Sequence, residues 1–179
     1  MPRPPYAGEA ALEALLSGPL AGFTRLNTFR MFAHAPDLGR AWLGVTHAIL
    51  NRLALSATLR EIAILQVARE TDCLYIWTQH ARLARRAGVE DGLITIIDRG
   101  GEISVRDGSD EALVRRAARE AATEGRIAAA TFDQVIQRLG NRAAVELVMV
   151  IGHYLAGAVF LKTTEVGMEP AHPHRGAPG

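Results

Sequence analysis

Apolar residues that recur every three or four positions are the feature that most constrains how this 179-residue chain can fold. On an α-helix this spacing gathers apolar side chains on one face. One segment shows the spacing at four successive positions: Leu38, Trp42, Val45 and Ile49. Strict alternation of apolar and polar residues, which is typical of strands, is scarce along the chain. The pattern therefore predicts an all-α fold, a helical bundle of about six to eight helices.

Glycine, proline and capping residues divide this pattern into separate helices. Ser56 and Ser109 are natural N-caps, and Asp72 is expected to cap the helix that follows it. The expected helices cover roughly residues 9–16, 20–33, 38–51, 57–69, 73–87, 89–99, 111–124, 131–140 and 142–164. We expect a single all-helical domain over residues 1–166, with residues 1–8 frayed. Residues 167–179 are expected to form a disordered, proline-containing tail.

Composition argues against several classes of protein. The chain has 20 Lys+Arg against 19 Asp+Glu, a balance that gives no support to nucleic-acid binding through a broad basic surface. Its single cysteine, Cys73, excludes an intrachain disulfide and suits a reducing compartment. No apolar run approaches the roughly 20 residues of a membrane helix, and the first residues lack the apolar stretch of a signal peptide. These observations predict a cytoplasmic protein without a nucleic-acid or membrane partner.

The helix expected over residues 73–87 carries the side chains of greatest chemical interest. Cys73 and His80 lie seven positions apart, with Ile76 and Trp77 between them, so all four share one helix face. Cys73 is expected in the first turn, where unpaired backbone N–H groups and the helix dipole favour a thiolate. A thiol, an aromatic ring and an imidazole are thus expected along one stripe.

Glu61 lies on the preceding helix, and its carboxylate reaches His80 if the two helices pack antiparallel. A glutamate–histidine pair in an apolar pocket can transfer protons to and from a substrate. Arg60 can hold a substrate carboxylate or form a salt bridge with a neighbouring glutamate. Ordinary structural roles stay open for each residue type: a cysteine as a small apolar side chain, a hydrogen-bonded histidine, a core tryptophan, or a glutamate that caps its own helix.

The order of these residues resembles the pattern of the carboxymuconolactone decarboxylase family, within the alkylhydroperoxidase-D-like superfamily. That pattern is an Arg-Glu pair, an apolar helix, a Tyr-Glu-Trp tripeptide and then a histidine. Here the positions read Arg60-Glu61, Tyr75-Ile76-Trp77 and His80, and the resemblance covers about residues 23–166. It implies an alkylhydroperoxidase-D-like helical bundle, a small-molecule substrate and a symmetric homo-oligomer, a trimer or a hexamer.

Ile76 departs from both branches of this superfamily. The decarboxylase pattern has a glutamate at this position, and the peroxidase pattern has a second cysteine. With Cys73 as the only thiol, a two-thiol disulfide relay within one chain is excluded. The apolar side chain at this position favours a hydrophobic substrate.

Three functions stay open. The first is a cofactor-independent enzyme that uses acid–base chemistry, either decarboxylation or isomerisation. The second is a peroxidase-like protein that uses one thiol and an external thiol partner. The third is a non-catalytic binding or structural member of the family. We expect no metal or cofactor, and assign candidate roles as follows: Glu61, His80 and Cys73 catalytic; Arg60, Tyr75, Ile76, Trp77 and His153 substrate-binding.

Overall fold

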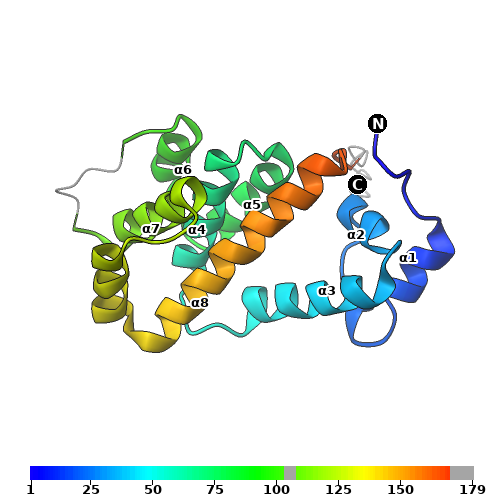
Figure 1. Ribbon diagram of the computed structural model, residues 1–179, viewed down its shortest axis with the longest axis horizontal. Coiled ribbons are helices and arrows are strands. Elements are labelled where there is room, and N and C mark those ends of the chain that lie inside the picture. The colour runs from blue at the N-terminus through cyan, green and yellow to red at the C-terminus, as the bar shows by residue number, and fades with distance from the viewer. Residues whose placement is uncertain (103–107, 170–179) are drawn as a thin grey trace, which may run out of the picture. The chain divides into compact units, whose positions relative to one another are not determined.

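The computed structural model describes residues 1–102 and 108–169, and every regular element in these two ranges is a helix (Figure 1). The elements are α1 (Glu9–Leu15), the 3₁₀ turn η1 (Gly18–Leu20), α2 (Asn27–Phe32), α3 (Pro36–Asn51), α4 (Ala57–Glu70), α5 (Leu74–Arg86), α6 (Asp91–Asp98), α7 (Asp110–Glu124) and α8 (Ala129–Thr163). The predicted all-α fold is therefore confirmed. The predicted disordered tail lies outside the described residues from position 170 onward.

The chain divides into two compact units. Among the described residues, an N-terminal unit comprises residues 1–41 and 164–169, and a core unit comprises residues 42–163. In the N-terminal unit, the predicted helix over residues 20–33 is shorter than expected and begins only at Asn27. The preceding segment makes turns instead, with Phe23 N donating to Leu20 O and Leu26 N donating to Thr24 O. Gly22 and Thr24 have low helix propensity, which favours this break.

Residues 1–8, which the sequence predicts to be frayed, make hydrogen bonds within the N-terminal unit. Ala7 N donates to Arg30 O at 3.3 Å, and Arg3 N donates to Thr164 O at 2.9 Å. Glu9, the first residue of α1, pairs with Arg25 and Arg30. Hydrogen bonds from Arg30 and Arg25 lower the pKa of the Glu9 carboxyl. The start of the chain is thus attached to α2 and to the residues after α8.

The core unit is built around α4, which packs against α5, α7 and α8 (Figure 1). Every residue from Glu61 to Ala68 is buried, so the helix has no solvent-facing side over these two turns. The predicted N-cap is confirmed, because Ser56 Oγ accepts a hydrogen bond from Leu59 N at 3.2 Å. A helix enclosed on all sides holds any polar side chain it carries in a fixed position, and α4 carries Glu61 and Gln66.

The break between α4 and α5 is tighter than the sequence predicts. Asp72 does not cap α5; it adopts φ of 49°, in the left-handed region, and Cys73 takes the N-cap position. A short aspartate tolerates that conformation better than most residues. The hydroxyl of Thr71 donates to Val67 O at 2.7 Å and satisfies one of the last carbonyls of α4. Cys73 therefore precedes the helix instead of lying in its first turn.

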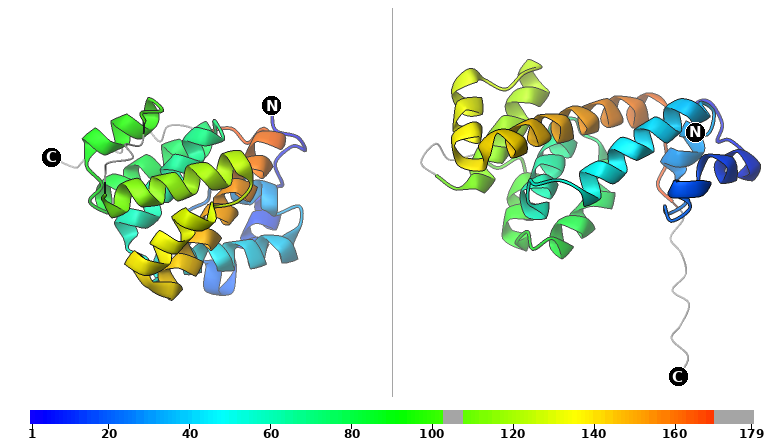
Figure 2. Two further views of the ribbon diagram at one scale, coloured as in Figure 1. Left: turned by 60° about the vertical axis from the view of Figure 1, so that its left-hand side comes forward. Right: turned by 90° about the horizontal axis from the view of Figure 1, so that it is seen from below.

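Helix α8 contains a sharp bend at Gly140, where φ is 82° and ψ is 162°, visible in the yellow segment of Figures 1 and 2. Only glycine adopts such angles readily. This bend confirms the two helices predicted on either side of residue 140.

By length and composition, α8 could cross a membrane, with 44% of its most apolar window buried inside the protein. The prediction that no segment is long and apolar enough to cross a membrane is wrong. It failed because α8 is apolar on the core side and also carries exposed Val145, Val148, Met149 and Val159. A core helix of a soluble protein passes the same test, so this is weak evidence for a membrane.

Candidate acid–base site

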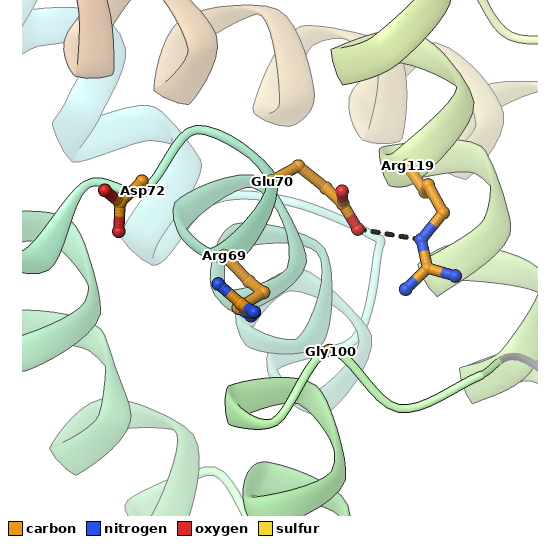
Figure 3. Close-up of a pocket in the computed structure, with 5 residues that line it drawn as sticks. All are labelled: Arg69, Glu70, Asp72, Gly100 and Arg119. Atoms are coloured by element: carbon orange, nitrogen blue, oxygen red, sulfur yellow. Dashed lines mark hydrogen bonds and ion pairs between the residues drawn. The ribbon is translucent and has the colours of Figure 1, made fainter.

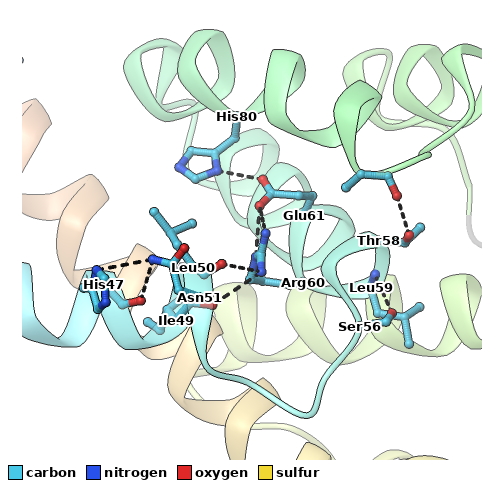
Figure 4. Close-up of polar contacts among 11 residues, drawn as sticks. His47, Ile49, Leu50, Asn51, Ser56, Thr58, Leu59, Arg60, Glu61 and His80 are labelled. Atoms are coloured by element: carbon cyan, nitrogen blue, oxygen red, sulfur yellow. Dashed lines mark hydrogen bonds and ion pairs between the residues drawn. The ribbon is translucent and has the colours of Figure 1, made fainter. Parts of the chain in front are cut away.

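The carboxylate of Glu61 is the centre of a buried polar cluster in the core unit (Figure 4). Its side chain is 0% exposed, and its two oxygens have different partners. Oε1 accepts from Arg60 Nε at 3.0 Å and from Arg60 Nη2 at 2.9 Å. Oε2 lies 2.8 Å from His80 Nδ1. The contact between Glu61 and His80, which the sequence leaves dependent on how the two helices pack, is therefore present. Both carboxylate oxygens are satisfied, as burial of a charge requires.

Arg60 holds the carboxylate from the other side and also satisfies the end of α3. Its Nη1 donates to Leu50 O at 3.1 Å, one of the last carbonyls of that helix, which has no partner within the helix itself. The guanidinium thus uses Nε, Nη1 and Nη2 on groups of the protein. This arrangement favours a positioning role for Arg60 over the predicted contact with a substrate carboxylate.

His80, on α5, presents one nitrogen to Glu61 and leaves the other available. Because a buried carboxylate accepts hydrogen bonds, Nδ1 carries a proton and donates it to Oε2. In the neutral ring Nε2 then carries the lone pair. Nε2 has no hydrogen-bond partner among the described residues, and the side chain retains 10% exposure. His80 can therefore accept a proton at Nε2 while Glu61 stabilises the imidazolium that forms.

Tyr154, on α8, completes the aromatic surroundings of His80. The two rings meet edge to face, with centroids 4.8 Å apart and planes at 83°. Burial raises the pKa of the Tyr154 hydroxyl, and the negative charge of Glu61 raises it further. The sequence reading did not assign Tyr154 to the site. No local signal marks it, because the contact with His80 depends on how α8 packs against the core helices.

His153 packs on the far side of Tyr154, with ring centroids 5.4 Å apart, and stacks on Trp42 at 4.0 Å. Its Nε2 lies 3.0 Å from Thr46 Oγ1, whose hydroxyl donates to Trp42 O at 3.0 Å. Because the hydroxyl proton is used there, His153 Nε2 is the donor to Thr46. Burial lowers the pKa of His153 to about 4, and the nearby charge of His80 contributes. His153 is consequently neutral at pH 7, and its ring packs on Tyr154, which contacts His80. Its contact with a substrate stays a prediction.

The thiol of Cys73 is not activated toward a thiolate, as the sequence predicts it to be. Its side chain is buried, with 3% exposure. Burial raises the pKa of the thiol, although backbone N–H groups of Ile76 and Tyr75 oppose the shift. The expectation of a stabilised thiolate is therefore wrong in direction. The N-cap position supplies the N–H groups that the sequence predicts, but desolvation by the core has the larger effect.

The remaining predicted site residues lie on α5 with His80. Ile76 and Tyr75 are buried, whereas Trp77 is half-buried. Ile76 lies one helical turn before His80, so it places an apolar side chain beside the imidazole. Their contacts with a substrate stay a prediction.

A separate charged cavity lies at the other end of α4. It has a volume of about 460 Å³ and is lined by Arg69, Glu70, Asp72, Gly100 and Arg119 (Figure 3). Arg119 Nε donates to Glu70 Oε1 at 2.7 Å. None of these residues is a predicted site residue, and Glu70 follows Glu61 by about 13 Å along the helix axis. Within the described residues, no three histidine, cysteine, aspartate or glutamate side chains cluster as metal ligands.

The comparisons with known proteins agree with the resemblance inferred from the sequence. Residues 36–96 match the model of the carboxymuconolactone decarboxylase family. No curated protein matches the chain. The matched segment contains Arg60, Glu61, Cys73 and His80, whereas His153 and Tyr154 lie beyond it.

Proposed function

We propose that this chain is a cofactor-independent enzyme that carries out decarboxylation or isomerisation of a small molecule by acid–base chemistry. The match of residues 36–96 to the model of the carboxymuconolactone decarboxylase family supports this proposal. The observation that supports this proposal most directly is the 2.8 Å contact between His80 Nδ1 and Glu61 Oε2. Glu61 is fully buried there, and its second oxygen is fixed by Arg60. The carboxylate is thus dedicated to orienting an imidazole.

In this proposal His80 Nε2 is the atom that moves protons. For an isomerisation, neutral His80 removes a proton from one substrate carbon and returns it to another. For a decarboxylation, the bond to the carboxylate breaks, carbon dioxide leaves, and protonated His80 gives a proton to the carbon that retains the electron pair. Glu61 holds the ring in one tautomer and balances its positive charge in either case. A positioned general acid or base contributes about 10²–10⁴-fold in rate.

The structure gives less support to the two alternative functions, a single-thiol peroxidase-like protein and a non-catalytic family member. A peroxidase-like reaction at Cys73 needs a thiolate, and the raised pKa of the buried thiol does not support one. A non-catalytic family member has no need to bury a carboxylate in contact with a histidine, since such a pair is costly to desolvate. The geometry of Glu61 and His80 therefore favours the acid–base enzyme.

We also propose that the enzyme is a cytoplasmic homo-oligomer, a trimer or a hexamer, whose partner is a hydrophobic small molecule and neither nucleic acid nor membrane. Support comes from the second half of α8, which exposes Val145, Val148, Met149 and Val159. Exposed apolar side chains along one helix suit an interface between subunits. Light scattering on the purified protein at micromolar concentration tests this, and a monomer would contradict it.

The proposed reaction is tested by substrate turnover in deuterated water, followed by NMR. The panel consists of apolar β-keto acids and carboxylated lactones, which report decarboxylation as loss of the carboxylate and isomerisation as deuterium at carbon. We expect Glu61→Gln and His80→Gln to lower turnover about 10²–10⁴-fold. His47→Gln is the matched control, because His47 contacts Asn51 at the end of α3 and not Glu61. Turnover that survives in both site variants, or its absence from the whole panel in the wild type, overturns the proposal.

A further inference from the structure

We infer that the hydroxyl of Tyr154 is the hydrogen-bond donor of this site, and that it binds a substrate carbonyl oxygen on which negative charge develops. This inference rests on the proposed function and adds the substrate class: a carbonyl compound whose reacting carbon lies next to the carbonyl group. Tyr154 lies outside the segment that matches the family. It reaches the Glu61–His80 pair from α8, through the contact of its ring with His80.

The first support is that no described residue forms a hydrogen bond with the hydroxyl. Tyr154 is 7% exposed, yet its oxygen makes no hydrogen bond with any described residue. A hydroxyl that no protein group uses is available to donate to water or to a ligand. By contrast, the hydroxyl of Tyr6 binds Gly167 N at 2.8 Å. Tyr154 therefore holds a donor that no described residue uses.

The second support is the position of this donor relative to the base. The Tyr154 ring contacts the His80 ring edge to face at 4.8 Å, and the His153 ring packs against it at 5.4 Å. These contacts fix the phenol between two imidazoles. The unpartnered hydroxyl and the unpartnered Nε2 of His80 thus belong to side chains in direct contact. A substrate that accepts a hydrogen bond from the Tyr154 hydroxyl is therefore close to His80 Nε2.

The third support is the protonation state of the phenol. Burial and the charge of Glu61 both raise its pKa. The hydroxyl therefore keeps its proton at neutral pH and acts as a donor instead of a base. A donor with a fixed position stabilises an oxyanion most strongly where water is excluded.

The chemistry balances with His80 as the only group that gains or loses a proton. When His80 Nε2 removes a proton from carbon, the C–H electron pair moves into the adjacent C–C bond and the carbonyl oxygen becomes an enolate oxygen. Tyr154 donates a hydrogen bond to that oxygen and retains its own proton. In a decarboxylation, the electron pair of the breaking C–C bond reaches the same oxygen as carbon dioxide leaves. Return of the pair to carbon is accompanied by protonation from His80.

Binding of 4-nitrophenolate tests this role without knowledge of the substrate. The probe has a flat ring and an anionic oxygen, and 4-nitroanisole is the matched probe that lacks the charged oxygen. We expect Tyr154→Phe to weaken binding of 4-nitrophenolate about 10–100-fold, the loss of one hydrogen bond to a charged group. Binding of 4-nitroanisole and the response of the control variant Tyr6→Phe should match the wild type.

The free energy of unfolding separates a ligand-binding hydroxyl from a structural one. Because the hydroxyl has no partner among the described residues, Tyr154→Phe should unfold at the same urea concentration as the wild type or a higher one. The inference is overturned if Tyr154→Phe binds 4-nitrophenolate normally, if it loses both probes equally, if it is clearly less stable, or if the wild type binds no nitrophenolate. None of these measurements requires proton transfer by His80, so they are independent of turnover.

Discussion

Lowering the pH from 7 to 5 should destabilise the protein through His153 in particular. In the folded protein, burial against Trp42 and Tyr154 lowers the pKa of this imidazole to about 4. In the unfolded chain its pKa is about 6.5. As the pH falls below 6.5, His153 binds a proton in the unfolded chain, whereas in the folded protein it does so only near pH 4. Stability is therefore lost as the pH falls, and the loss is complete below about pH 4.

The size of the effect follows from the two pKa values. Between pH 7 and pH 5 the unfolded state gains about 2 kcal/mol from binding this proton, and the full loss below pH 4 is about 3 kcal/mol. His153→Gln removes the titrating group and keeps an amide that can donate to Thr46. The variant is less stable at pH 7, because it loses the stacking on Trp42, but its stability should change less with pH.

Urea unfolding followed by circular dichroism at pH 5, 6 and 7 measures this difference. The wild type should lose about 2 kcal/mol more than His153→Gln between pH 7 and pH 5. Other titrating groups contribute to both proteins and largely cancel in the comparison. The control His47→Gln should follow the wild type. Equal pH dependence in wild type and His153→Gln would refute the reasoning that burial keeps this histidine neutral.

Three further predictions concern stability and reactivity. Arg60→Gln should lower the free energy of unfolding by about 3 kcal/mol, because it leaves Glu61 buried with a weaker partner; urea titration at pH 7 measures this, and a loss under 1 kcal/mol would contradict it. Ser56→Ala should cost about 1 kcal/mol by removing the N-cap of α4, and Ser56→Asp should restore most of it, which thermal unfolding checks. Cys73 should react with iodoacetamide more slowly than a free thiol at pH 8, as mass spectrometry can follow; rapid alkylation of the folded protein would show a thiolate instead.

The local pattern of the sequence was sufficient for most of the fold and for the candidate residues at the centre of the site. Helix spacing and capping residues predict α4 and α5. The order of Arg60-Glu61 and His80 marks the two residues as candidates, and their contact depends on how the two helices pack. The helices themselves depend on residues close together in the chain. The bend at Gly140 was predictable for the same reason, because glycine interrupts an otherwise apolar helix.

Long-range packing explains what the sequence did not predict. Tyr154 meets His80 only because α8 packs against the core helices, and no local pattern specifies that partner. The hydrogen bond from Arg60 to Leu50 O, at the end of α3, likewise depends on how the helices pack. The thiol of Cys73 was misjudged because its environment is set by the core around it and not by the helix start alone.

The most direct test of the account is the tautomer of His80, read from the ¹⁵N chemical shifts of its ring by NMR. The structure predicts a proton on Nδ1 held by Glu61 and an unprotonated Nε2 in the neutral ring, with Glu61→Gln changing this preference. Equal populations of the two tautomers, or identical spectra in wild type and Glu61→Gln, would contradict the claim that the buried carboxylate prepares His80 for proton transfer.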